Sequence, residues 1–177
     1  MAELELVRKA AAAGAPFAAV VLCHCYLGFR PTAFLALTCA DYDADRRCFV
    51  GGIKTAAGIG RTVPVSPKVQ KYVDGLIALA DGGSVFGLLG KPIGLKDYRT
   101  KFYDLLEKLH IENPVDEDGR HRLTPHSCRH TFANLLKNVE GAGKDKASLI
   151  GHTDYAFTEK RYQSAELDNL LDIVNKM

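Results

Sequence analysis

Residues 124–133, which read Thr-Pro-His-Ser-Cys-Arg-His-Thr-Phe-Ala, decide the fold. Thr124 followed by Pro125 is a typical helix start, because threonine caps the first turn and proline suits its first position. The predicted helix carries His126 and Arg129 in its first turn, three residues apart on one side. Its buried face is predicted by apolar residues at helical spacing, namely Phe132, Leu135, Leu136 and Val139.

The start of this helix has the chemistry of an anion site. Free N–H groups and the helix dipole attract negative charge there. Arg129 adds a planar fork that can bind two phosphate oxygens at once, and His126 adds an imidazole. The alternative interpretation is a solvated helix start that carries a histidine and an arginine by chance.

Two helices are predicted before this segment, and an arginine follows them. Residues 3–12 form the first, and residues 15–27 form a largely buried second helix that ends at Gly28. Pro31 begins a third helix that runs to about Thr38. Arg30 therefore lies at a junction between helices, where it can point into a cleft or form a surface ion pair.

A β-hairpin is predicted between residues 48–54 and 61–65, around the glycine-containing stretch 56–60. Lys54 ends its first strand, where it is either a reactive group on a turn or an exposed hairpin lysine. Ser66 and Pro67 then start another helix.

The remaining elements are helical. An amphipathic helix covers residues 102–109, a charged loop covers 113–122, and short helices follow at 144–150 and near 155–162. The tail at 163–177 repeats the helical pattern with Leu167, Leu170, Leu171 and Val174. The predicted fold is mainly α with a small antiparallel β-sheet (α+β), as one domain over residues 1–177.

Taken in order, these segments resemble the tyrosine recombinase (phage integrase) family. The match runs from Gly28-Phe29-Arg30 through Lys54 and the 124–133 string to Gly151-His152 and Tyr162. The resemblance implies the catalytic domain of a site-specific DNA recombinase, in which Arg30 and Arg129 hold the scissile phosphate. It also implies that Lys54 is the β-hairpin lysine, His126 and His152 are the active-site histidines, and Tyr162 is the nucleophile.

The implied chemistry is cleavage and rejoining of DNA through a covalent 3′-phosphotyrosine. The phosphate oxygens need fixed cations, and Lys54 would give a proton to the leaving 5′-oxygen. Nearby arginines would lower the pKa of the Tyr162 phenol, and His126 would take or share its proton. No metal or organic cofactor is expected.

One position departs from the pattern of the resembled family. Ala33 stands where that family commonly has an acidic residue, three positions after the first arginine. We expect reduced but not abolished activity, which Ala33→Glu should raise. The resemblance also implies an N-terminal DNA-binding domain that is absent from this chain, and a tail helix that docks on a neighbouring subunit.

Composition adds limits to this interpretation. The net charge of +2 is weak support for a polyanion partner. Basic residues nevertheless cluster in two places, at Arg120-His121-Arg122 and at Lys91, Lys96, Arg99, Lys101 and Lys108. Five cysteines without a disulfide framework indicate reduced thiols and a cytoplasmic location. Cys23-His24-Cys25 is predicted to belong to the core and not to a metal site. The expected partners are double-stranded DNA at the nucleoid and further copies of the chain, as a tetramer, with no membrane.

Three alternatives remain open. A type IB topoisomerase would use a similar nucleophile and phosphate clamp, but would relax supercoils as a monomer without a preferred site. A DNA-binding module that has lost catalysis is suggested by Ala33 alone. A helical scaffold without a role on DNA is suggested by the low net charge.

Overall fold

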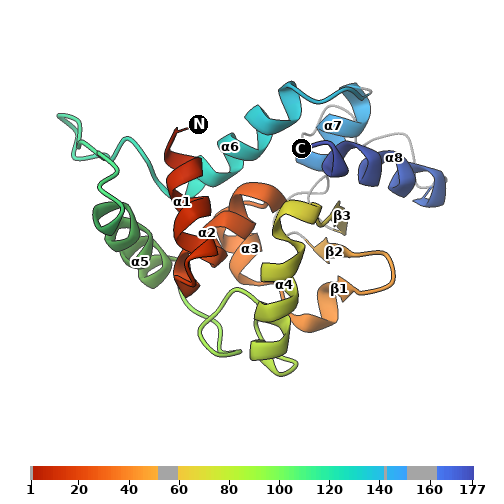
Figure 1. The fold of residues 1–177 in the computed structure, drawn as a ribbon, viewed down its shortest axis with the longest axis horizontal. Coiled ribbons are helices and arrows are strands. Elements are labelled where there is room, and N and C mark those ends of the chain that lie inside the picture. The colour runs from red at the N-terminus through yellow and green to blue at the C-terminus, as the bar shows by residue number, and fades with distance from the viewer. Residues whose placement is uncertain (1, 52–59, 142, 151–162) are drawn as a thin grey trace.

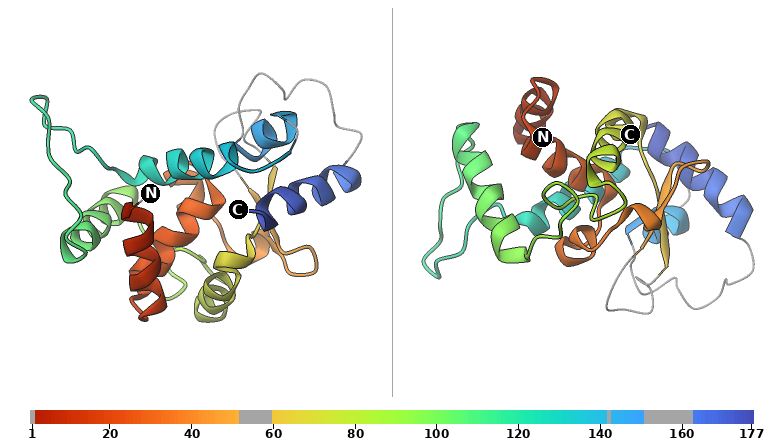
Figure 2. Two further views of the ribbon diagram at one scale, coloured as in Figure 1. Left: turned by 45° about the horizontal axis from the view of Figure 1, so that its top comes forward. Right: turned by 90° about the horizontal axis from the view of Figure 1, so that it is seen from below.

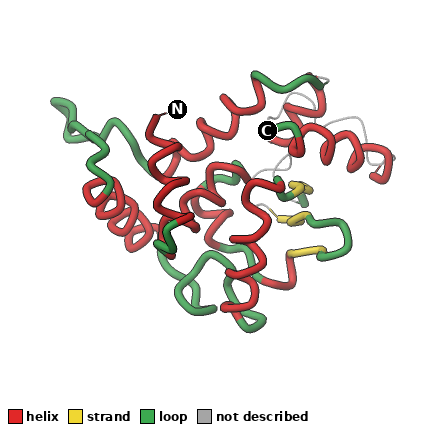
Figure 3. The backbone as a smooth tube through the Cα atoms, in the orientation of Figure 1, coloured by secondary structure: helices red, strands yellow, loops and turns green. Residues whose placement is uncertain are grey.

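The computed structural model describes residues 2–51, 60–141, 143–150 and 163–177. The described chain is mostly helical, with one small antiparallel sheet (Figures 1 and 3). This confirms the predicted fold class. In Figure 1, α5 (Leu95–Lys108) lies on one side of the molecule, and the sheet and α8 (Gln163–Asn175) lie on the other.

Helix α2 (Pro16–Leu27) forms the centre of the core. Its sequence is apolar along nearly its whole length, and such a helix must be covered on all sides. Helix α1 (Ala2–Ala12), α4 (Pro67–Ala80), α5 and α6 (Pro125–Lys137) pack around it. Figure 2 shows α6 crossing α2 and leading toward α7 (Gly143–Ile150).

Helix α3 (Pro31–Leu35) is shorter than predicted, because the chain leaves the helix to make tertiary contacts. Leu37 is buried, and its carbonyl accepts a hydrogen bond from the Val85 amide at 3.0 Å. Thr38 forms a β-bridge with Ser84. Only a short 3₁₀ turn, Cys39–Asp41, follows.

The sheet contains the predicted hairpin and one further strand. Strands β2 (Cys48–Gly51) and β3 (Arg61–Pro64) pair antiparallel, with Phe49 opposite Val63. Strand β1 (Tyr42–Asp43) pairs with β2 on its other edge, and two residues are too few for a sequence pattern to predict. Lys54 lies outside the described residues.

Helices α4 and α6 begin at the predicted Ser66-Pro67 and Thr124-Pro125 pairs. The Ser66 hydroxyl accepts a hydrogen bond from the Lys68 amide at 3.4 Å. Helix α7 begins at Gly143, the last residue of the break predicted at 141–143. The helix expected near residues 155–162 lies outside the described residues.

The tail helix α8 packs against β3 and α7 of its own chain. Leu167, Leu170 and Val174 are buried there, so the apolar face of the tail is covered without a partner. Docking of this helix on a neighbouring subunit stays a prediction. Within the described part of the chain, no helix has the length and apolar character to cross a bilayer.

Candidate active site

Arg30 follows a tightly fixed turn between α2 and α3. Gly28 ends α2 with a φ of 60°, and its amide donates to the His24 carbonyl at 3.0 Å. A Cβ atom at this glycine would lie 2.1 Å from a ring carbon of Phe132. Glycine is therefore required both by the left-handed backbone and by the close approach of α6.

The fully buried side chain of His24 stabilises the same turn by a hydrogen bond to its backbone. Its Nε2 lies 3.0 Å from the Phe29 carbonyl oxygen, which can only accept, so Nε2 carries the proton. Its Nδ1 then accepts from the Tyr98 hydroxyl at 2.9 Å. Burial lowers the pKa of His24 to about 3, so the ring is neutral. The interpretation of Cys23-His24-Cys25 as core is confirmed by the burial of all three residues.

Arg129 joins this turn to the end of α7. Its Nη1 donates to the Gly28 carbonyl at 2.8 Å, and its Nη2 donates to the Ile150 carbonyl. Burial, followed by the positive charge of Arg30, lowers the pKa of Arg129 to about 10, which leaves it charged at neutral pH. A guanidinium has five N–H donors, so three remain for an anion.

A third arginine, Arg61 of β3, belongs to the same cluster and was not predicted. Its Nη1 donates to the Leu149 carbonyl at 2.8 Å, and its guanidinium carbon lies 4.3 Å from the centre of the Phe29 ring. Burial, then Arg129 and Arg30, lowers its pKa to about 9. A signal for it existed in the sequence, because Arg61 shares the buried face of its strand with Val63 at a spacing of two.

His126 is an exposed residue in the first turn of α6, beside the arginine cluster. Its ring centre is 5.1 Å from that of His130, one turn further along. Partial burial and the charges of His130, Arg129 and Arg30 lower its pKa from 6.5, so the neutral form predominates at pH 7. The structure therefore brings together Arg30, His126 and Arg129, since the charges of the two arginines both act on His126. Their roles as site residues stay a prediction.

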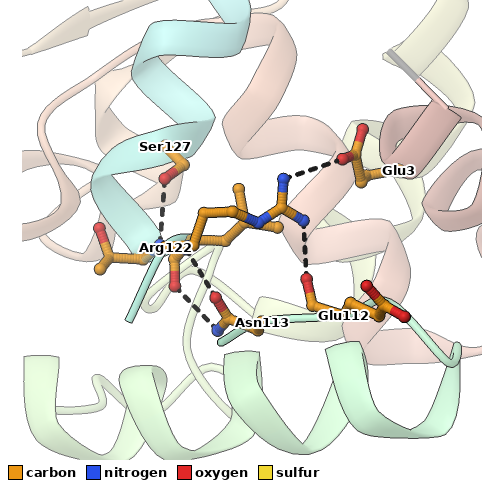
Figure 4. Close-up of polar contacts among 7 residues, drawn as sticks. Glu3, Glu112, Asn113, Arg122 and Ser127 are labelled. Carbon is orange, nitrogen blue, oxygen red and sulfur yellow. Dashed lines mark hydrogen bonds and ion pairs between the residues drawn. The ribbon is translucent and has the colours of Figure 1, made fainter. Parts of the chain in front are cut away.

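The start of α6 is anchored by polar contacts to α1 and to the segment after α5 (Figure 4). Arg122 donates to a Glu3 carboxylate oxygen at 3.4 Å and to the Glu112 carbonyl at 2.7 Å. The Asn113 side chain bonds both backbone groups of Leu123, at 2.6 and 3.1 Å. The Ser127 hydroxyl accepts from the Thr124 amide at 3.0 Å, which closes the first turn.

Three of the predicted site residues, Lys54, His152 and Tyr162, lie outside the described residues. Ala33 is buried in α3, so a larger side chain there would have to find space in the core. Among the described residues, no three histidine, cysteine or acidic side chains are grouped as metal ligands would be.

Comparison with known proteins places these features in a family context. The chain is 24% identical over 151 residues to the tyrosine recombinase XerC of Erythrobacter litoralis, a match that spans 84% of this chain and 46% of that protein. It is 32% identical over 94 residues to the transposase from transposon Tn916 of Enterococcus faecalis, across 51% of this chain and 22% of the transposase. The chain thus spans less than half the length of these curated relatives.

Solved structures show the same fold. The XerA recombinase superposes with a TM-score of 0.66 at 20% identity, over 95% of this chain and 60% of that one. The Tn1549 transposon integrase in complex with circular intermediate DNA gives a TM-score of 0.61 at 21% identity, over 86% of this chain and 57% of the integrase. The family model for the phage integrase family matches residues 3–167, and the chain belongs to that family.

Proposed function

We propose that this chain is the catalytic domain of a site-specific DNA recombinase that cuts and rejoins DNA through a covalent 3′-phosphotyrosine at Tyr162. The observation that carries the proposal is the convergence of Arg30, Arg129 and His126 at the start of α6. Among the described residues, no ion pair joins either arginine to a carboxylate. Cations without an acidic partner in the described part of the chain suit a site that receives a phosphate.

The reaction needs no energy source, because each step exchanges one phosphodiester for another. The Tyr162 oxygen attacks the phosphorus, the bond from phosphorus to the 5′-oxygen breaks, and the phosphate stays on the tyrosine. A 5′-hydroxyl later attacks the same phosphorus and releases the phenol. Arg30 and Arg129 would stabilise the charge that grows on the non-bridging oxygens in both directions.

Two protons have to move in the cleavage step. His126 is the candidate acceptor for the phenol proton, and the lowered pKa keeps its ring neutral at pH 7. Lys54 is the candidate donor to the leaving 5′-oxygen. His152 is the second histidine of the proposed site and would bind the phosphate beside the arginines.

The proposed substrate is double-stranded DNA at the ends of a mobile element, in integration or excision. Support comes from transposon relatives and from the Tn1549 integrase, whose structure is a complex with circular intermediate DNA. Assembly as a tetramer on DNA is part of the proposal, with the tail helix α8 exchanged between subunits. Because the proposed substrate is double-stranded DNA, the protein would act in the cytoplasm at the nucleoid.

Covalent capture tests the proposal directly. The chain is incubated with nicked duplexes from the ends of its mobile element or the neighbouring genome, and adducts are separated on denaturing gels. We expect a protein–DNA adduct on the 3′ side of the break, which Tyr162→Phe abolishes. Tyr103→Phe is the matched control, because this tyrosine lies in α5 and packs against His121.

Each result has a distinct meaning. An adduct that depends on Tyr162 establishes the nucleophile and the reaction class. An adduct that persists in Tyr162→Phe would show that the nucleophile is wrong. Binding of every duplex without any adduct would contradict catalysis and favour a DNA-binding module, whereas relaxation of supercoils without a preferred site would favour the topoisomerase alternative.

A further inference from the structure

Arg61 contacts the turn that precedes Arg30 and the end of α7, to which Arg129 also binds. It packs on Phe29, the neighbour of Arg30, at 4.3 Å from the ring centre. It also donates to the Leu149 carbonyl at 2.8 Å, and Arg129 donates to the next carbonyl along, that of Ile150. Arg61 therefore lies directly behind the site, at the point where β3 meets the end of α7.

Within the described part of the chain, no acidic side chain pairs with Arg61. The residue is only 8% exposed, and its buried Nη2 has no hydrogen-bond partner among the residues that the structure describes. The charges of Arg129 and Arg30 both act on Arg61 and lower its pKa further. A buried cation without an acidic partner is costly, and an anion bound nearby would offset that cost.

We propose that Arg61 is a positioning residue of the phosphate site, which adds a third positive charge behind Arg30 and Arg129. It also holds the turn before Arg30 and the end of α7 that Arg129 binds. The inference rests on the proposed function, since the anion it serves is the scissile phosphodiester. Arg61 would not donate to this phosphate through Nη2, because that atom is buried. It acts through the field of its charge and through its contacts with Phe29 and Leu149.

The expected effect is large enough to measure. At an effective dielectric constant of about 20, a unit charge roughly 10 Å from a phosphate changes its affinity about tenfold. Arg61→Gln should therefore weaken phosphate binding about tenfold. Arg61→Lys keeps the charge and one donor, so it should restore most of the affinity although it loses the planar fork.

The test uses inorganic phosphate as the probe and the full chain as the protein. Side-chain Nε–H signals of Arg30, Arg61 and Arg129 are followed by NMR as phosphate is added. We expect all three to shift with one dissociation constant in the wild type, weakened in Arg61→Gln and largely recovered in Arg61→Lys. The control is Arg8→Gln, which removes an exposed arginine paired with Glu5 on α1 and should bind as the wild type does.

Two results would overturn the inference. The first is an Arg61 signal that does not move in the wild type while those of Arg30 and Arg129 do, a reading that stands even if Arg61→Gln fails to fold. The second is equal weakening in the folded Gln and Lys variants, which would leave no role for the charge. Covalent capture on DNA is measured separately, so a chain that binds phosphate through Arg61 but forms no adduct would reject only the recombinase proposal.

Discussion

Arg61 and Arg129 donate hydrogen bonds to consecutive carbonyl oxygens, those of Leu149 and Ile150 at the end of α7. The last carbonyls of a helix have no partner within it and carry the negative end of its dipole. The two guanidinium groups give these carbonyls hydrogen-bond donors and place positive charge at the negative end of the dipole. The same two residues thus cap α7 and concentrate positive charge behind Arg30.

Replacing Arg129 with lysine should destabilise the protein although the charge is kept. A single ammonium cannot span the Gly28 and Ile150 carbonyls as the guanidinium does, so one buried acceptor loses its partner. We expect a loss of about 1–3 kcal/mol in the free energy of unfolding, measured by urea denaturation. Arg99→Lys, at an exposed position of α5, is the control and should change little. Equal stability of the two variants would show that the double contact contributes nothing.

Local sequence patterns predicted the parts of the site that depend on local structure. The Thr124-Pro125 start fixes α6, and the helix period then places His126 beside Arg129. The place of Arg61 in the site depends instead on a contact between β3 and α7, in which Arg61 and Leu149 are 88 residues apart in the chain. No local sequence pattern specifies that contact. The early end of α3 has the same origin, because pairing of Thr38 with Ser84 overrides helical propensity.

Tyr98→Phe tests the buried hydrogen bond under Arg30. Loss of the hydroxyl leaves Nδ1 of His24 without its donor in a fully buried place. The expected cost is about 1–3 kcal/mol of unfolding free energy, read from chemical denaturation. Tyr103→Phe, in the same helix but partly exposed, should cost well under half as much. The hydrogen bond would be irrelevant to stability if both variants unfolded at the same denaturant concentration.

The stability of the protein should fall in acid because of His24. Its pKa is lowered from 6.5 to about 3 by burial, so the unfolded state binds a proton that the folded state refuses. The free energy of unfolding therefore rises with pH between the folded-state pKa of about 3 and the ordinary value of 6.5. His24 contributes up to about 1.4 kcal/mol per pH unit to this rise. Denaturation curves between pH 4 and 7 measure the slope, and NMR should show a His24 ring that stays neutral in the folded protein. A His24 ring that titrates near its ordinary value while the protein is folded would contradict the prediction.

Gly28→Ala should be among the most damaging small substitutions in the chain. The new methyl group would meet the Phe132 ring at 2.1 Å, on a backbone with a φ of 60°. We expect a loss of at least about 2 kcal/mol, since strain and overpacking add. Gly75→Ala in α4 is the matched control, because its Cβ would enter open space and alanine favours a helix by roughly 0.5–1 kcal/mol. We expect the melting temperature to fall in Gly28→Ala and to rise in Gly75→Ala. A shift of the same sign in both variants would contradict the prediction.

The lowered pKa of His126 gives a prediction about catalysis. Partial burial is its main cause and the neighbouring His130 is the next, so His130→Gln should raise the pKa of His126 toward 6.5. A base works only when deprotonated, so the acid limb of the cleavage rate should move to higher pH in this variant. NMR titration of the His126 ring and the pH profile of adduct formation measure the two shifts independently. If the ring titration moves and the rate profile does not, His126 is not the group that accepts the phenol proton.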